Sequence, residues 1–149
     1  MSIKVDLENN LHEAMRNKNE ITRDTLRVVL SSVKFAEIEI GRQLDDNGIL
    51  SIIQKEVKIR RETINELKNT NRMDLIDKAQ KELDILIHYL PAQLSDHEIE
   101  ALAREVIEST SAKSMSDMGK VMGILVPKLT GQAAPERISQ LVRNLLAQS

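Results

Sequence analysis

The sequence contains no cysteine and no tryptophan, and its only aromatic residues are Phe35 and Tyr89. Without cysteine the chain has no disulfide, no thiolate metal site and no cysteine nucleophile. Two aromatic rings in 149 residues exclude the stacked aromatic platform that binds single-stranded bases, and they leave an aliphatic core. No apolar run approaches the roughly 18 residues that a membrane-spanning helix requires.

An excess of charge of one sign is also missing. The 21 Lys and Arg residues nearly balance the 23 Asp and Glu residues, so no global field attracts the chain to nucleic acid or to anionic lipid. The first residues lack the apolar core of a signal peptide and include Asp6, Glu8, Glu13 and Glu20, unlike an acid-poor transit peptide. We therefore expect a cytoplasmic protein that has no membrane association.

Apolar residues recur every three or four positions along almost the whole chain, and alternating strand patterns are absent. This periodicity predicts an all-α fold. A first helix surrounds Val5 to Met15, and a second, over residues 21–40, is apolar on most sides and should lie centrally. A long third helix follows Asp45 and runs to about Lys68. A fourth stops at Pro91 and should form an antiparallel hairpin with the third.

The best boundary in the chain is the stretch "YLPAQLSDHE". Ser95 and Glu98 have the spacing of a capping box, which predicts that a new helix starts there. A sixth helix follows from Met118, and Pro135 is suited to the first turn of a seventh. We therefore predict an N-terminal four-helix part over residues 1–91 and a small three-helix C-terminal domain over residues 92–149.

The segment "MGKVMGILVPKLTGQA" combines helical periodicity with Gly119, Gly123, Gly131 and Pro127. A glycine in a helix interior costs roughly 1 kcal/mol relative to alanine, so something should offset it. One interpretation is that a neighbouring helix crosses closely over the small residues. The other is that a phosphate backbone lies against an exposed strip beside Lys120, and the two interpretations are compatible.

Local charge adds to the second interpretation. From residue 112 to the end there are five basic residues against two acidic ones, a local charge of +3 in a chain of net charge −2. Such a patch is suited to a weak, salt-sensitive phosphate contact. An ordinary solvated surface is the alternative explanation.

The segments "MGKVMGILVPKLTGQA", "QLVRNLL", "QKEVKIRRETINEL" and "YLPAQLSDHEIE" together resemble the YqeY family of small bacterial proteins, over nearly the whole chain. The C-terminal part is also similar to the tail domain of the B subunit of the glutamine-dependent aminoacyl-tRNA amidotransferase, which grips transfer RNA. The resemblance implies an all-helical two-part fold and an affinity for transfer RNA. Carried over by position, it implies these RNA-binding residues: Gly119, Lys120, Gly123, Lys128, Gly131 and Arg143. The family usually has an acidic residue and a glycine before the last helix, where this chain has "AAPE", so Ala134 cannot cap that helix with a side-chain oxygen.

Residues for independent catalysis are not evident. The three histidines, His12, His88 and His97, lie on separate expected helices without metal-ligand spacing, and no Gly-rich phosphate loop is present. We assign no catalytic residue, no metal site and no cofactor. The family link is to carbon–nitrogen ligase chemistry with glutamine as the amide donor, and a partner would have to supply that apparatus.

Two functions from different classes remain. The favoured one is a non-catalytic accessory that holds transfer RNA by shape and backbone, alone or beside an amidotransferase. The alternative is a protein–protein adaptor whose long helical hairpin presents an exposed apolar strip along residues 49–90. The cluster Lys55, Lys58 and Arg61 on that hairpin could bind a partner or could simply form ion pairs with nearby glutamates.

Overall fold

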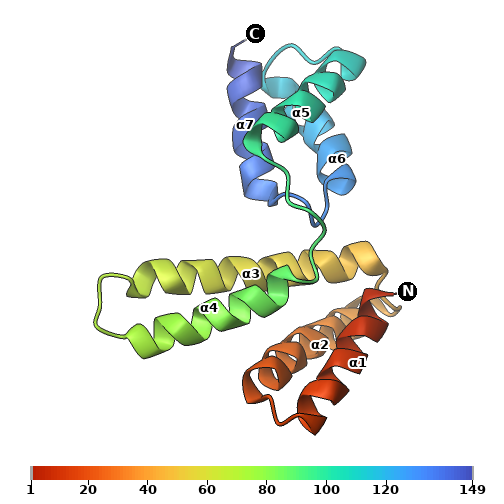
Figure 1. Ribbon diagram of the computed structural model, residues 1–149. Coiled ribbons are helices and arrows are strands. Elements are labelled where there is room, and N and C mark those ends of the chain that lie inside the picture. The colour runs from red at the N-terminus through yellow and green to blue at the C-terminus, as the bar shows by residue number, and fades with distance from the viewer. Residues whose placement is uncertain (1, 149) are drawn as a thin grey trace. The chain divides into compact units, whose positions relative to one another are not determined.

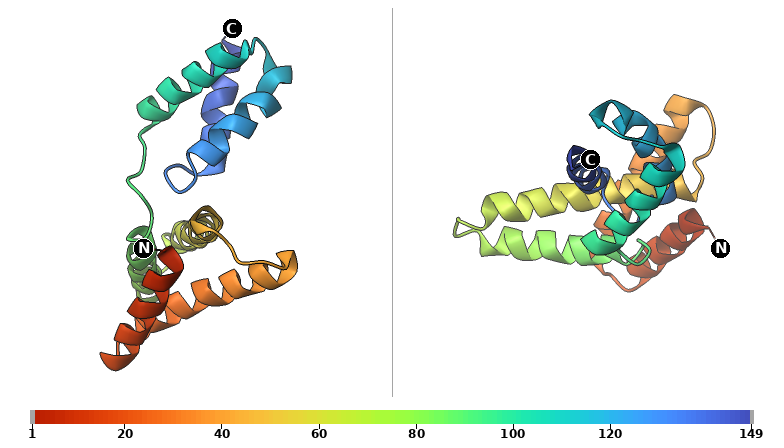
Figure 2. Two further views of the ribbon diagram at one scale, coloured as in Figure 1. Left: turned by 90° about the vertical axis from the view of Figure 1, so that its right-hand side faces the viewer. Right: turned by 90° about the horizontal axis from the view of Figure 1, so that it is seen from above.

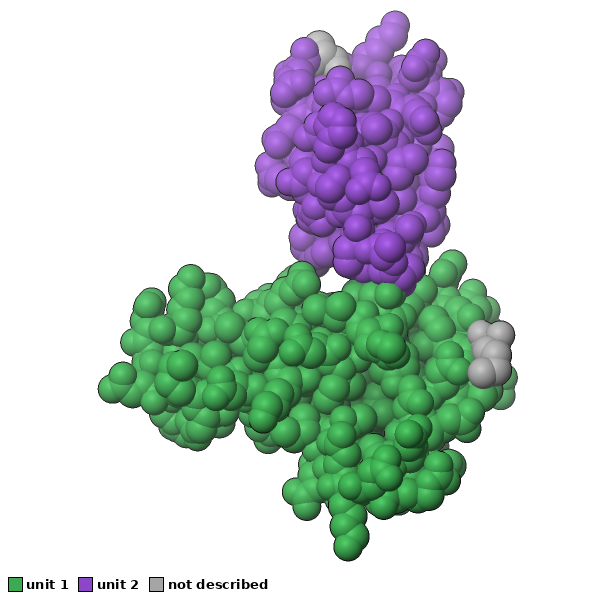
Figure 3. Space-filling model, in the orientation of Figure 1, with its two compact units in different colours: residues 1–90 green, residues 91–149 purple. Residues whose placement is uncertain are grey.

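The computed structural model describes residues 2–148, and these form seven α-helices, one short 3-10 helix and no strand (Figure 1). The predicted all-α fold is therefore confirmed. Contacts along the chain divide it into two units, residues 1–90 (unit 1) and residues 91–149 (unit 2), coloured separately in Figure 3. Among the described residues, no helix combines the length and the apolar character needed to cross a membrane.

Unit 1 begins with two helices that run antiparallel along each other (Figure 1). Helix α1 spans Ile3–Arg16, and helix α2 spans Glu20–Ile40. The side chain of Asn19 accepts a hydrogen bond from the backbone N–H of Thr22 and so caps α2. Gly41 ends α2 with φ +74°, a left-handed conformation that glycine adopts without strain.

The other half of unit 1 is the predicted helical hairpin. Helix α3 spans Asp46–Leu67 and is capped by Asp45, and helix α4 spans Met73–Ile87. The guanidinium of Arg60 joins the two helices, because it contacts Glu56 on α3 and lies 3.4 Å from a carboxylate oxygen of Glu82 on α4. Helix α4 ends before Leu90, because tight backbone turns replace the helical hydrogen bonds after Ile87.

The core of unit 1 is aliphatic, as the near absence of aromatic residues predicts. Helix α2 contacts α1, α3 and α4, so its central position is confirmed. Its outer side nevertheless remains uncovered within unit 1, and Val28, Phe35 and Ile38 are exposed there. The buried residues of this core are Leu7, Leu26, Val29, Val33, Ile49, Ile53, Val57, Leu83 and Leu86.

Unit 2 packs three helices around a second aliphatic core (Figure 2, left). Helix α5 spans Asp96–Thr110 and starts with the predicted capping box between Ser95 and Glu98. The 3-10 helix η1 (Met115–Asp117) leads into helix α6 (Met118–Lys128), and helix α7 spans Pro135–Ala147. The core residues come from all three helices and from the loops: Ile99, Ala103, Val106, Ala112, Val121, Leu125, Leu129, Ala133, Ile138, Val142, Leu145 and Leu146.

Candidate nucleic-acid interface

The predicted RNA-binding segment is α6, and its two faces differ sharply. Val121, Leu125 and Leu129, which follows the last residue of the helix, are buried in the core of unit 2, with Met118 and Met122 packed against them. Helical periodicity turns the remaining positions to the opposite side. That outer side, which we call the α6 strip, consists of the exposed residues Gly119, Lys120, Gly123, Ile124 and Pro127.

Both helical glycines of the α6 strip are open to solvent. A Cβ atom built on Gly119 or on Gly123 meets no atom within 4 Å. Close packing of a neighbouring helix is therefore the wrong explanation for these two residues. Each glycine costs α6 up to about 1 kcal/mol of helix stability, and no packing within unit 2 compensates for it.

Pro127 contributes a second irregularity to the strip. It lies in the last turn of α6, which ends one residue later at Lys128. Proline has no N–H, so the carbonyl oxygen of Gly123, four residues earlier, receives no helical hydrogen bond from it. Exposed glycines and this carbonyl give the strip backbone groups that another molecule can approach.

The N-terminal end of the strip is not purely cationic. The carboxylate of Asp117 accepts hydrogen bonds from the backbone N–H groups of Lys113, at 2.9 Å, and Ser114, at 3.4 Å. These bonds, with a smaller contribution from the charge of Lys120, hold the pKa of Asp117 below its usual range. A fixed negative charge therefore lies next to Lys120 and reduces its attraction for a phosphate.

The cations implied by the resemblance are exposed but dispersed. Lys120 and Lys128 are eight residues apart on α6, which corresponds to roughly 12 Å along the helix axis. Arg143 is exposed in the second half of α7, and α7 runs antiparallel to α6 (Figures 1 and 2). The second half of α7 therefore lies beside the first half of α6. Arg137, which also contributes to the local positive charge, is engaged with Asp96 at 2.5 Å.

Gly131 does not belong to the α6 strip. It is buried in the loop between α6 and α7, and its φ of +82° is in the left-handed region. Its carbonyl oxygen accepts a hydrogen bond of 2.7 Å from the side chain of Gln93. The turn geometry alone accounts for a glycine at this position.

Two members of the strip were absent from the predicted set. Ile124 and Pro127 lie between the glycines and Lys128 on the exposed side, and a helical projection of α6 would have identified both. Gln93 was missed for another reason, since the stretch around it was interpreted only as a boundary. A contact between residues 38 positions apart leaves no periodic signal in the sequence.

The predicted absence of an N-cap on α7 is confirmed. Ala134 occupies the N-cap position with extended backbone and makes no side-chain hydrogen bond, while Pro135 follows in the first turn. The loop before α7 thus lacks the acidic residue and the glycine of the family pattern. It offers no side chain for contacting a ligand at Ala134.

The three histidines lie on separate elements of the structure. His12 is exposed on α1, His88 follows the end of α4, and His97 lies in the first turn of α5. Across residues 2–148, no three His, Cys, Asp or Glu side chains come close enough together to hold a metal ion.

The hydroxyl of Tyr89 is half-buried at the end of unit 1. It accepts a hydrogen bond of 2.7 Å from the side-chain amide of Asn10, which links α1 to the segment after α4. Burial raises the pKa of Tyr89, so this hydroxyl stays protonated at neutral pH and acts as a structural link.

Comparison with known proteins identifies close relatives over most of the chain. A family model described as "Yqey-like protein" matches residues 4–146. The chain is 29% identical over 144 residues to "Altered inheritance of mitochondria protein 41, mitochondrial" of Pyrenophora tritici-repentis (strain Pt-1C-BFP), a match that covers 94% of this chain and 78% of that protein. It is 30% identical over 138 residues to the protein of the same name from Lachancea thermotolerans (strain ATCC 56472 / CBS 6340 / NRRL Y-8284), with 87% of this chain and 70% of that protein covered.

The comparisons correct one prediction and confirm another. Both relatives are named as mitochondrial proteins, which overturns the prediction of a cytoplasmic protein. That prediction depended on the composition of the first thirty residues and on the lack of a long apolar run. Such features indicate whether a targeting segment or a membrane span is present, and they do not identify the compartment in which the members of a family work. The resemblance drawn from the glycine-containing segment and its companions is confirmed, and the chain belongs to the YqeY family.

Proposed function

We propose that this protein is a non-catalytic accessory that binds transfer RNA through the α6 strip and the neighbouring cations of unit 2. The observation that supports the proposal is the open space over Gly119 and Gly123. Two helical glycines that no neighbour covers lower the stability of the helix, and no packing contact compensates for this loss. The binding of an RNA backbone flat against the helix would compensate for it.

The chemistry of the strip is suited to recognition by shape. Lys120, Lys128 and Arg143 supply the phosphate contacts, and their dispersal favours an extended backbone over a single phosphate. The carbonyl oxygen of Gly123, which receives no N–H from Pro127, can accept a hydrogen bond from a ribose 2′-hydroxyl. That hydroxyl is the group that distinguishes RNA from DNA.

The direct test is binding of transfer RNA at low salt, measured by fluorescence anisotropy. We expect the double variant Lys120→Glu and Lys128→Glu to bind at least tenfold more weakly than the unchanged chain. We also expect log K of the double variant to fall less steeply with log salt. The slope should be smaller by the contribution of about two phosphate contacts. The matched control is Lys68→Glu with Lys81→Glu, which makes the same charge change on unit 1. Equal affinity of the two double variants would contradict the proposal.

The adaptor alternative required an exposed apolar strip along residues 49–90. In that range the exposed large apolar residues are Ile59 in α3 and Met73 and Leu75 at the start of α4, and they do not follow one helical face. Pull-down with and without nuclease separates the two functions. Partners that are lost with nuclease favour the RNA accessory, and partners that are retained favour the adaptor.

A further inference from the structure

Three exposed apolar side chains of unit 1 lie on one side of α2. Val28 is 43% exposed, Phe35, the only phenylalanine of the chain, is 65% exposed, and Ile38 is 70% exposed. The core-facing residues of the same helix, Leu26 and Val29 among them, are fully buried. Helix α2 therefore carries an apolar face that no other element of unit 1 covers.

The spacing of this face indicates what kind of surface it fits. With the exposed Ser31 between them, the residues fall at positions 28, 31, 35 and 38, an alternation of three and four residues. That 3.5-residue period is the one with which two helices pack along each other. We call Val28, Ser31, Phe35 and Ile38 the α2 seam, and its partner should be another helix.

We propose that the α2 seam packs against the α2 seam of a second copy of this chain, with the two helices antiparallel. A two-fold axis at residue 33 sets Phe35 opposite Ser31 of the second copy and Val28 opposite its Ile38. The largest side chain of the seam then meets the smallest one, twice, by symmetry. The seam is therefore complementary in side-chain size to the same seam of a second copy.

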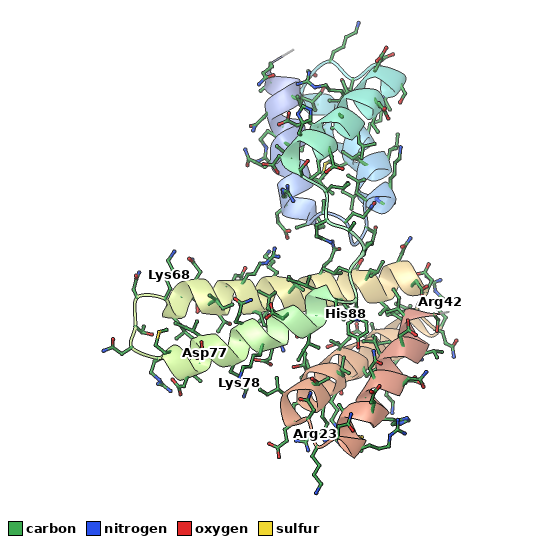
Figure 4. All side chains as sticks on the ribbon, viewed as in Figure 1. Arg23, Arg42, Lys68, Asp77, Lys78 and His88 are labelled. Carbon is green, nitrogen blue, oxygen red and sulfur yellow. The ribbon has the colours of Figure 1, made fainter. Side chains whose placement is uncertain are left out.

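Charge at the two ends of the seam favours the same orientation. Asp24, whose carboxylate accepts a hydrogen bond of 2.9 Å from Arg23, is exposed one turn before Val28, and Arg42 is exposed two residues after the end of α2. In Figure 4, Arg23, next to Asp24, and Arg42 mark opposite ends of the helix. An antiparallel pair brings each Asp24 to the end that carries Arg42 of the other copy, whereas a parallel pair would set Asp24 against Asp24.

One contact opposes the pairing and limits its strength. Lys34 lies beside the seam close to the two-fold axis, so it would approach Lys34 of the second copy. A single pair of helices also buries less than the roughly 1,200 Å² of a standard interface. We therefore expect a reversible dimer whose population rises with protein concentration.

Sedimentation velocity of the full chain over a range of concentrations tests the association. We expect the weight-average mass to rise with concentration in the unchanged chain and to remain that of a monomer in the double variant Phe35→Glu and Ile38→Glu. The control is Ile59→Glu, because Ile59 is a comparably exposed apolar residue, at 44%, on α3. Both changes replace exposed side chains, so the fold should persist, which far-ultraviolet circular dichroism checks. A monomer at every concentration, or equal association of both variants, would overturn the proposal.

Cross-linking tests the orientation, and the absence of cysteine makes each introduced thiol the only one in its chain. With a short bismaleimide, a mixture of Val28→Cys chains and Ile38→Cys chains should cross-link, because the two positions face each other. Neither variant alone should do so, since its two thiols would lie about 15 Å apart along the helices. Cross-linking within either variant alone would show a parallel pair and would contradict the antiparallel seam.

Discussion

The side-chain amide of Gln93 donates hydrogen bonds to the carbonyl oxygen of Gly131, at 2.7 Å, and to that of Pro91, at 2.8 Å. Next to it, the backbone N–H of Leu94 donates to the carbonyl oxygen of Gln132 at 3.0 Å. The segment before α5 is thereby fastened to the loop between α6 and α7. Unit 2 is closed by polar contacts at the same end at which its chain enters.

The Gln93 bridge should contribute measurably to the stability of unit 2. We expect Gln93→Ala to lower the free energy of unfolding of unit 2 by about 1 kcal/mol, because the change removes a net hydrogen bond to a partly buried carbonyl. Urea denaturation followed by far-ultraviolet circular dichroism measures this. Gln43→Ala, at an exposed position of unit 1, is the control that should leave stability unchanged. An unaltered midpoint for Gln93→Ala would show that the bridge carries no net energy.

The glycines of the glycine-containing segment should respond to alanine in opposite directions. Gly119→Ala and Gly123→Ala should each stabilise unit 2 by up to about 1 kcal/mol, since the added methyl group meets open space and alanine is the better helix former. Gly131→Ala should destabilise it by about 1 kcal/mol or more, because φ of +82° strains any residue with a Cβ. Thermal unfolding of the three single variants compares the directions.

Combining that series with RNA binding separates stability from function. If the α6 strip binds transfer RNA, Gly119→Ala with Gly123→Ala should weaken binding even as it stabilises the fold, because two methyl groups then hold the RNA backbone away. A double variant that is more stable and binds equally well would remove the strip from the proposed interface.

A missing cap on α7 offers a test of the fold itself. Ala134 holds the N-cap position without a side-chain acceptor, so Ala134→Ser should raise the free energy of unfolding by about 1 kcal/mol. Ala147→Ser, at the last residue of the same helix, introduces the same hydroxyl where no N–H is free to receive it. The control should show no gain, and equal effects of both changes would contradict the capping explanation.

The carboxylates of unit 2 should make its stability depend on pH in the acid range. Backbone and side-chain hydrogen bonds from Ser95 lower the pKa of Glu98, and backbone hydrogen bonds from Lys113 and Ser114 lower that of Asp117. A lowered folded-state pKa means that the unfolded chain binds protons more readily, so stability rises with pH through this range. The contribution of these carboxylates to stability is complete above the ordinary carboxyl pKa, near pH 4. It is lost as the pH falls through the lowered pKa values.

Urea titrations between pH 5 and pH 2.5 check this dependence. We expect Asp117→Asn and Glu98→Gln each to flatten it, since neither replacement titrates. The control is Asp74→Asn, which removes an exposed carboxylate on α4 of unit 1. It should leave the pH dependence of unit 2 unchanged. A slope for unit 2 that neither Asp117→Asn nor Glu98→Gln reduces would contradict the assignment.

The sequence predicted the elements well because their signals are local. The positions of Asp45, Ser95 and Gly41 set helix ends through hydrogen bonds and backbone conformations that depend on a few neighbouring residues. The faces of the helices were harder to predict. Helix α2 is apolar on most sides, so its periodicity does not distinguish the exposed Phe35 from the buried Val33.

In the candidate site, too, the features set by local sequence could be predicted, and those set by distant contacts could not. The core side of α6 followed from periodicity, but whether Gly119 and Gly123 were covered depended on where α5 and α7 pass. Gly131 was grouped with them by sequence and differs from them in conformation, since only its φ is positive. A contact such as that of Gln93 with the loop carries no pattern that a single sequence reveals.

The two aromatic rings of the chain, Phe35 and Tyr89, both belong to residues 1–90. Tyrosine emission and near-ultraviolet absorbance will therefore report on unit 1 alone, and the helices that carry the α6 strip are spectroscopically silent there. A tryptophan placed at an exposed position of α5, such as Glu105, would give the second half of the molecule an optical signal of its own. The melting of the two halves could then be followed separately in one sample.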